Sequence, residues 1–410
     1  MTLPDFEHNL AKYADLAVET GVEVRPGDTV YVQIDVTQAQ LAHLIVAAAY
    51  KAGAAEVLVD WQDDTLKRLD IKYLADDRLA VRPPFVAGQF DYWLAHNAKR
   101  ITVMSANPDN LAGVSPERVA AYNAGFQKAY SRLSNAITTN AISWTIIAAA
   151  GAEWADKVFP EDDHDTAIDK LWDQIFTTTR VYTDDPNQAW RDHDARLSTK
   201  AEWLNQYQFD ALHYEAPGTD LTVGLPQNHI WQAADSQNPR GETFMANMPT
   251  EEVFTVPDAR RINGTVASTK PLAYSGNILD GMHFTFKDGE VVAFSAAKGQ
   301  DTLGQLLQIK GAKSLGEVSL VPDPSPISQS GITFFNTLFD ENASDHMALG
   351  QAYPFAIVGG TDMTPDEQRA AGLNIADTHV DFMMGSAQMN IDGITHDGQR
   401  VPIFRNGDWA

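Results

Sequence analysis

Residues 29–61, TVYVQIDVTQAQLAHLIVAAAYKAGAAEVLVDW, contain one complete strand–helix–strand repeat. The β-branched run at 29–36 predicts a strand, the alanine-rich run at 38–53 a helix that ends at Gly53, and AEVLVDW at 55–61 a second strand. Strands that alternate with helices in this way lie parallel in one sheet. This repeat therefore predicts an α/β fold for the N-terminal half.

The same alternation continues on the C-terminal side of this repeat. RITVMSA at 100–106 and ISWTIIAAA at 142–150 predict two further strands, and helical patterns run between them and on to residue 207. We therefore predict an α/β, doubly wound parallel-sheet domain over residues 1–207. The glycine-rich motifs G-x-G-x-x-G and G-x-x-x-x-G-K-[ST] are absent from the sequence, so nothing indicates nucleotide binding and we expect this domain to be a scaffold.

The pattern changes after residue 208, where short strands and turns rich in Gly, Asn and Asp replace the helices. KDGE at 287–290, for example, joins two alternating runs and is typical of a β-hairpin. Helical interruptions are expected near 299–310 and 364–371. We predict a mainly antiparallel β (α+β) domain over residues 208–410, and every candidate catalytic residue lies in it.

Composition excludes several classes of function. The 410 residues carry a formal net charge of −25, which disfavours nucleic acid and anionic membranes as partners. Without any cysteine, the chain has no disulfide, no cysteine-ligated metal and no thiol nucleophile. The N-terminus lacks the basic and apolar regions of a signal peptide, and no apolar run reaches about 18 residues. These features predict a cytoplasmic protein.

Residues 337–388 contain a cluster of possible metal ligands. His379 and Asp381 are two residues apart in a predicted strand, so both side chains leave the same face. Glu341 and His346 flank a short turn that can bring them together. Imidazoles and carboxylates are ligands that Zn²⁺, Co²⁺ and Mn²⁺ accept. Each residue alone is more simply explained as a surface or ion-paired side chain, and the hypothesis depends on their convergence.

Two upstream segments share a Glu-Val pattern that ends in proline. Glu252 lies in TEEVFTVP and Glu317 in LGEVSLVP, and a glutamate is rarely buried without a partner. Glu251 should point to the opposite face from Glu252, so only Glu252 is expected at the site. The simpler interpretation of Tyr353 is that it packs in the core. The more specific interpretation is that its hydroxyl stabilises an oxyanion during the reaction. We expect all these segments to meet at one metal centre.

Four motifs in this order resemble one known family. NMPTEEVFTVP (247–257), SLGEVSLVP (314–322), NTLFDENASDHMALGQAYP (336–354) and THVDFMMGS (378–386) are similar to the thermophilic-type metallo-aminopeptidases, a group that includes aminopeptidases T, S and PepS. The resemblance spans the full chain. It implies a two-metal exopeptidase that releases N-terminal residues from short peptides with a free N-terminus. It also implies a homodimer.

The resemblance assigns roles to individual residues. The implied metal ligands are Glu252, Glu317, Glu341, His346, His379 and Asp381, with Tyr353 beside the two metal ions and Glu317 or Glu341 available to carry a proton. Two positions depart from the family pattern: Glu251 replaces the usual glycine, and Asp345 replaces a frequent cysteine. Both departures are expected to add negative charge near the site.

Two other functions are compatible with the same residues. A metal-dependent amidohydrolase or phosphoesterase would use the same cluster but would not need a free α-amine on its substrate. A non-catalytic binding protein would use the sheet domain as its platform and would tolerate Glu317→Gln and His379→Ala. The identity of the metal, whether zinc, cobalt or manganese, is not determined by these ligand types.

Overall fold

The computed structural model describes residues 3–275 and 277–410. Contacts between Cα atoms divide the chain into two compact units. Unit 1 comprises Met1–Asp192 and Asp235–Pro249, and unit 2 comprises His193–Ala234 and Thr250–Ala410. This division differs from the predicted boundary after residue 207, because helix α9 (Pro186–Tyr207) spans the change and a later segment returns to unit 1.

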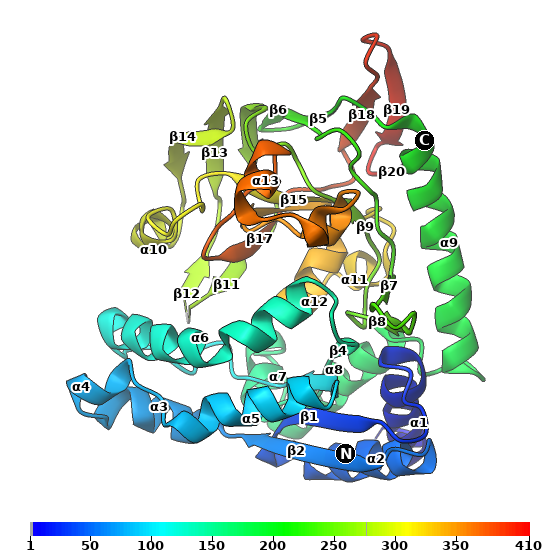
Figure 1. Cartoon of the computed structure of the whole chain (residues 1–410), viewed down its shortest axis with the longest axis vertical. Coiled ribbons are helices and arrows are strands. Elements are labelled where there is room, and N and C mark those ends of the chain that lie inside the picture. Colours follow the sequence, from blue (N-terminus) through cyan, green and yellow to red (C-terminus); the bar gives the residue numbers. More distant parts are fainter. Residues whose placement is uncertain (1–2, 276) are drawn as a thin grey trace. The chain divides into compact units, whose positions relative to one another are not determined.

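Unit 1 is an α/β unit whose four parallel strands have the order β2-β1-β3-β4. Its strands are β1 (Thr29–Asp35), β2 (Glu56–Gln62), β3 (Lys99–Met104) and β4 (Trp144–Ala148). Its helices, which Figure 1 shows in blue to green, are α1 (Phe6–Leu16), α2 (Ala39–Lys51), α3 (Asp64–Tyr73), α4 (Asp76–Leu79), α5 (Pro84–Ala95), α6 (Pro116–Thr138), α7 (Ala152–Val158) and α8 (His164–Thr178). The strand–helix alternation predicted from the sequence is confirmed.

The segment Asp235–Pro249 adds a small hairpin to unit 1. Its strands β7 (Asp235–Gln237) and β8 (Thr243–Met245) pair antiparallel. The residues that follow extend the parallel sheet, because the Ile146 N–H donates to the Ala246 carbonyl and the Met248 N–H to the Ile146 carbonyl. This insertion was not predicted from the sequence pattern.

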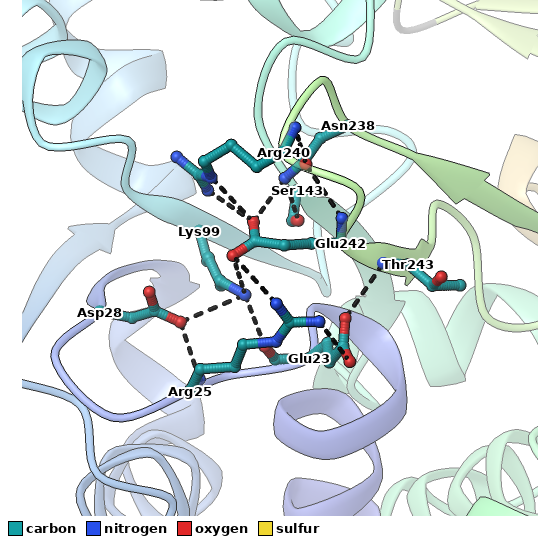
Figure 2. Close-up of polar contacts among 9 residues, drawn as sticks. All are labelled: Glu23, Arg25, Asp28, Lys99, Ser143, Asn238, Arg240, Glu242 and Thr243. Carbon is teal, nitrogen blue, oxygen red and sulfur yellow. Dashed lines mark hydrogen bonds and ion pairs between the residues drawn. The ribbon is translucent and has the colours of Figure 1, made fainter.

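A group of charged residues around the buried Lys99 and Glu242 side chains fixes this hairpin (Figure 2). The Nζ atom of Lys99, which is fully buried, lies 3.2 Å from Asp28 Oδ2 and 3.5 Å from Glu242 Oε1. On its other side, Glu242 Oε2 lies 2.6 Å from Arg240 Nη2. We call Glu23, Arg25, Asp28, Lys99, Arg240 and Glu242 the Lys99 cluster. It contains three acidic and three basic side chains, so its formal charge is balanced.

Unit 2 contains two main antiparallel sheets. The larger has the order β14-β13-β10-β6-β5-β18-β19-β20, and the smaller has the order β17-β16-β15-β9. The strands of the larger sheet are β5 (Ala211–Ala216), β6 (Thr219–Gly224), β10 (Ile262–Ala267), β13 (His283–Lys287), β14 (Glu290–Ser295), β18 (Asn390–Ile394), β19 (Arg400–Arg405) and β20 (Asp408–Trp409). The predicted hairpin at 287–290 is the β13–β14 turn, where Lys287 pairs with Glu290.

The smaller sheet carries the candidate site. Its strands are β9 (Val253–Thr255), β15 (Leu315–Leu320), β16 (His346–Gly350) and β17 (His379–Met383). The remaining elements of unit 2 are β11 (Leu272–Tyr274), β12 (Asn277–Leu279), α10 (Gln300–Leu306), α11 (Pro326–Gln329), α12 (Thr337–Asp340) and α13 (Pro365–Ala370). The predicted mainly antiparallel α+β architecture is confirmed. No helix among the described residues is both long and apolar enough to cross a lipid bilayer.

Candidate metal centre

The register of the smaller sheet brings the candidate ligands to one face. Glu317 on β15 and Asp381 on β17 both lie opposite Ala348 on the central strand β16. Residues directly opposite each other in antiparallel strands point to the same face. His379 is likewise opposite Gly350, and His346 begins the same strand. Small residues at positions 348 and 350 therefore leave space over β16, and charged side chains surround that space.

Gly350 is required for this arrangement. Its φ angle is +117°, a value that residues with a side chain rarely adopt. A Cβ atom at this position would lie 2.0 Å from the carbonyl oxygen of Thr378. The pairing of β15 with β16 also shifts register between Leu315 and Glu317, a bulge that changes the direction of the side chain that follows it.

Three groups of side chains offer ligand atoms within 4.8 Å of one another. The groups overlap in pairs, since Glu317 belongs to two of them, as do His346 and Asp381. The three groups are Glu252–Glu317–His346, Glu317–His379–Asp381 and Glu341–His346–Asp381. We call these six residues the ligand cluster. The structure thus brings together all six residues that the sequence analysis selected as metal ligands.

The distances within the ligand cluster are short. His346 Nε2 lies 3.1 Å from Glu252 Oε2 and 3.6 Å from Glu317 Oε1. His379 Nε2 lies 3.5 Å from Glu317 Oε2 and 3.4 Å from Asp381 Oδ1. Glu317 therefore lies between the two imidazoles, with one carboxylate oxygen toward each.

Both histidines are oriented by hydrogen bonds from their other ring nitrogen. The Nδ1 atom of His346 lies 2.9 Å from the Glu341 carbonyl oxygen, and Nδ1 of His379 lies 2.7 Å from the Gln351 carbonyl oxygen. A carbonyl oxygen only accepts, so Nδ1 carries the proton that it receives and Nε2 is left facing the carboxylates. This is the arrangement that metal-binding histidines adopt in proteins.

The cluster holds more negative charge than its surroundings neutralise. Glu252, Glu317 and Glu341 are buried, and the Oδ1 atom of Asp381 is buried without a hydrogen-bond donor. Among residues 3–275 and 277–410, no lysine or arginine forms an ion pair with any of these four carboxylates. Burial, together with the charges of Asp381 and Glu252, raises the pKa of Glu341 well above its usual value. The donor set and its charge fit a divalent cation.

The histidine pKa values respond to the same excess of carboxylates. Burial alone would lower the pKa of His346, but the neighbouring Glu252, Glu317 and Asp381 outweigh it and raise this pKa well above its usual value. Burial also lowers the pKa of His379, and Tyr353, Asp381 and Glu317 outweigh it. The site therefore favours positive charge at both Nε2 positions, where a metal cation would take the place of the proton.

Tyr353 lies beside the ligand cluster. Its ring centroid is 4.9 Å from that of His379 and 5.2 Å from that of Phe355, against which it stacks. Burial raises the pKa of Tyr353 above its usual value, so the hydroxyl keeps its proton and can donate a hydrogen bond. This placement agrees with the position predicted for it next to the ligands.

Two residues that depart from the family pattern lie outside the ligand cluster. The Glu251 carboxylate lies 3.5 Å from His193 Nε2, and none of the three ligand groups includes it. Asp345 Oδ1 accepts a hydrogen bond from the Val321 N–H, and burial raises the pKa of Asp345 to about 8. Because Asp345 is then mainly protonated at pH 7, the negative charge expected from it near the site is largely absent.

The groups that orient the candidate ligands were not predicted from the sequence. Ser319 Oγ donates a hydrogen bond of 2.5 Å to Glu252 Oε2, and the Asn342 amide contacts Glu341 Oε1 at 3.4 Å. Strand periodicity contained a signal for Ser319, because it lies two residues after Glu317 and therefore on the same face. The carbonyl of Gln351 had no comparable signal, since a backbone group is not specified by residue type.

Comparison with known proteins identifies the family. A sequence profile described as thermophilic metalloprotease (M29) matches residues 6–409. Aminopeptidase PepS of Streptococcus thermophilus is 55% identical and aminopeptidase AmpS of Bacillus subtilis 47% identical, each over 100% of both chains. The structure of AmpT from Thermus thermophilus matches with a TM-score of 0.93 at 36% identity, over 99% of this chain and 100% of that one. The chain therefore belongs to the thermophilic metalloprotease family, which confirms the family and the enzyme class, a metallo-aminopeptidase, that its sequence motifs indicated.

Proposed function

We propose that this protein releases N-terminal amino acids from short peptides, and that the ligand cluster holds two divalent metal ions for this reaction. The observation that carries the proposal is the overlap of three ligand groups through Glu317, His346 and Asp381. Shared carboxylates and an excess of negative charge favour more than one cation over a single ion.

The six residues of the ligand cluster would bind the ions, and Glu317, placed between the two imidazoles, is the residue best positioned to be shared by both. When bound, such ions acidify water and polarise a peptide carbonyl, which is the chemistry that hydrolysis requires. The chain's residues contribute the remaining functions. A carboxylate that is not fully used as a ligand, Glu317 or Glu341, moves a proton to the leaving amine. The Tyr353 hydroxyl donates to the developing oxyanion.

The negative charge of the site also accounts for the selectivity proposed here. A peptide with a free α-amino group brings a positive charge to a cluster that contains four carboxylates, and an N-acetylated peptide does not. An internal peptide bond would have to bury neutral backbone against the same carboxylates. The proposed substrates are therefore short peptides with an unblocked N-terminus.

The proposal is tested with leucine-p-nitroanilide and two comparison substrates, its N-acetylated form and p-nitrophenyl phosphate. We expect hydrolysis that is lost in a strong chelator and restored by Zn²⁺, Co²⁺ or Mn²⁺, together with no turnover of the N-acetylated substrate. Metal analysis of the purified protein should give two ions per chain. Turnover of the N-acetyl anilide or of p-nitrophenyl phosphate would favour the amidohydrolase or phosphoesterase alternative, and full activity after exhaustive chelation would exclude metal-dependent hydrolysis altogether.

Two properties implied by the family resemblance remain predictions. We propose that the protein is a homodimer, which light scattering after gel filtration would measure directly. We also propose a cytoplasmic location, which fractionation of the source cells would test.

A further inference from the structure

Unit 2 contains a polar cavity of about 610 Å³ that shares no residue with the ligand cluster. It lies where the loops that flank β5, β6 and β10 meet the segment after residue 356 and the β18–β19 turn. The lining residues that matter here are Asp210, Asp258, Arg260, Arg261, Val358 and His396.

Two consecutive arginines supply positive charge to this cavity. Arg261 donates from Nε to Asp258, from Nη1 to Asp210 Oδ1, and from Nη2 to the carbonyls of Asp210 and Leu225. Arg260 donates from Nε and Nη2 to Asp258 and from Nη1 to the Ala370 carbonyl. A guanidinium has five N–H groups. Within the described part of the chain, one N–H of Arg261 and two of Arg260 are therefore left for a ligand.

The cavity also offers a carboxylate oxygen. Asp210 Oδ1 accepts from Arg261 at 3.0 Å and lies 3.6 Å from His396 Nδ1, whereas the other oxygen, Oδ2, has no partner among the described residues. Both oxygens of Asp258, in contrast, accept from the arginines. Asp210 is thus the acidic group in this cavity that can still receive a donor.

The apolar part of the lining completes the pattern. Ile357, Val358 and Met363 line the cavity beside the charged groups, and Val358 is 61% exposed. Free guanidinium N–H groups, a free carboxylate oxygen and an apolar wall match, in turn, the carboxylate, the ammonium group and the side chain of an α-amino acid.

We propose that this cavity binds a free α-amino acid with an apolar side chain. A phosphate would meet the carboxylates of Asp210 and Asp258, and a metal cation would meet the two arginines, so a ligand with only one sign of charge is repelled by half of the site. A zwitterion satisfies both signs. The interpretation of this amino acid as the enzyme's own product rests on the proposed function, whereas the binding site itself depends only on the cavity.

Calorimetric titration of the full-length protein with L-leucine tests this inference without measuring hydrolysis. Leucinol, which the enzyme cannot hydrolyse, lacks the carboxylate, and N-acetyl-leucine lacks the ammonium group, so we expect each to bind at least tenfold more weakly than leucine. Arg260→Gln removes two of the three free guanidinium N–H groups, and Val358→Trp fills the cavity from an exposed position. Both variants should weaken leucine binding at least tenfold.

Two matched variants control for changes of charge and of surface bulk. Arg369→Gln removes a comparably exposed arginine, and Val292→Trp enlarges a comparably exposed valine; both positions are in unit 2 and neither lines the cavity. Leucine affinity should be unchanged in both. Equal leucine affinity in all four variants would place any bound leucine elsewhere, including at the ligand cluster, and would overturn the proposal. Failure of the unaltered protein to bind leucine would also overturn it, whether or not the protein hydrolyses peptides.

Discussion

Two groups of charged residues, one in each unit and each containing buried carboxylates, differ in how their charge is balanced. The Lys99 cluster of unit 1 contains three carboxylates with one lysine and two arginines (Figure 2). The ligand cluster of unit 2 contains four carboxylates and two imidazoles, and no lysine or arginine from the described residues pairs with them. Burying a charge is costly unless an opposite charge compensates it. The first cluster supplies this compensation from its own side chains, and the second does not.

The pKa values show the consequence of this difference. Burial of Glu242 in unit 1 is outweighed by hydrogen bonds from Arg240 and Asn238 and by the charge of Lys99, which lower its pKa to about 2. Burial of Glu341 in unit 2 is reinforced by Asp381 and Glu252, which raise its pKa. Similar burial thus has opposite effects, because only one carboxylate has cations beside it. A balanced cluster serves to hold a structure together, and an unbalanced one is suited to binding cations.

The largest expected effect comes from neutralising one carboxylate of the ligand cluster. Glu252→Gln should lower kcat/KM by about 10³-fold, on the order of 4 kcal/mol, because one of the proposed ligands to the activating metal ion would be lost. The bound metal measured after dialysis should fall in parallel. Its neighbour Glu251 provides the matched control, since Glu251→Gln makes the same chemical change on the side that faces His193.

The Glu251→Gln control can contradict the role proposed for Glu252. We expect Glu251→Gln to retain kcat/KM within about tenfold and to keep its full metal content. Equal losses in both variants would mean that the excess charge as a whole, and not ligation by Glu252, controls the activity.

The second prediction concerns the balanced cluster in unit 1. Glu242→Gln leaves the buried Lys99 with Asp28 as its remaining carboxylate, and breaking a buried ion pair in this way should cost about 3 kcal/mol of unfolding free energy. Urea unfolding followed by tryptophan fluorescence would measure this loss. Glu161→Gln, at an exposed position in unit 1, should change the unfolding free energy by less than about 0.5 kcal/mol.

The pH dependence of this loss follows from the lowered pKa of Glu242. A carboxylate whose pKa falls from 4.5 in the unfolded chain to about 2 in the folded one stabilises the fold above about pH 4.5. This contribution disappears as the pH falls from 4.5 toward 2. The stability difference between the unaltered protein and Glu242→Gln should therefore be constant near neutral pH and shrink below pH 4.5. A difference that grows on acidification would contradict the role assigned to Glu242.

The sequence predicted the ligand cluster more completely than the Lys99 cluster, for a physical reason. His379 and Asp381 are related by strand periodicity, and Glu252 and Glu317 occur in similar apolar contexts, so their residue types and spacing carry information. Lys99 and Glu242 have no such relation. Their meeting depends on the return of the Asp235–Pro249 hairpin to unit 1, and its three-residue strands give too short a pattern to recognise.

The register of the smaller sheet was equally hidden in the sequence. Glu317 and Asp381 lie on the two strands that flank β16, and both pair with Ala348. The pairing of Glu317 with Ala348 depends on the register shift between Leu315 and Glu317. A shift of one residue would turn the whole set of side chains to the other face. The sequence indicated which residues form the ligand cluster, and the strand pairing determined how their side chains are arranged.

A smaller effect on activity is expected from Tyr353, a neutral residue beside the ligand cluster. Tyr353→Phe removes the hydroxyl of the ring that lies beside His379 and leaves the six residues of the ligand cluster in place. We expect kcat to fall about 100-fold, as for loss of one oxyanion donor, with unchanged metal content. Phe355→Leu changes an aromatic ring that stacks on Tyr353 without removing a hydroxyl and should have a smaller effect on kcat. Loss of metal in Tyr353→Phe would instead make the tyrosine part of the binding site for the ions.

The smallest predicted effect separates charge from orientation within the ligand cluster. Ser319→Ala removes the hydroxyl that donates to Glu252 Oε2 but leaves every charge of the cluster unchanged. Groups that orient a metal ligand typically contribute about 10- to 100-fold to metal affinity, and we expect the lower end, about tenfold, because Glu252 keeps its contact with His346. Metal titration against a chromogenic chelator would measure it, with Ser314→Ala, on the segment before β15, as a control. If Ser319→Ala bound metal as tightly as the unaltered protein, the excess negative charge alone would account for the metal affinity of the site. A tenfold loss of metal affinity would show that the ligand cluster also depends on a neutral hydrogen bond that orients the Glu252 carboxylate.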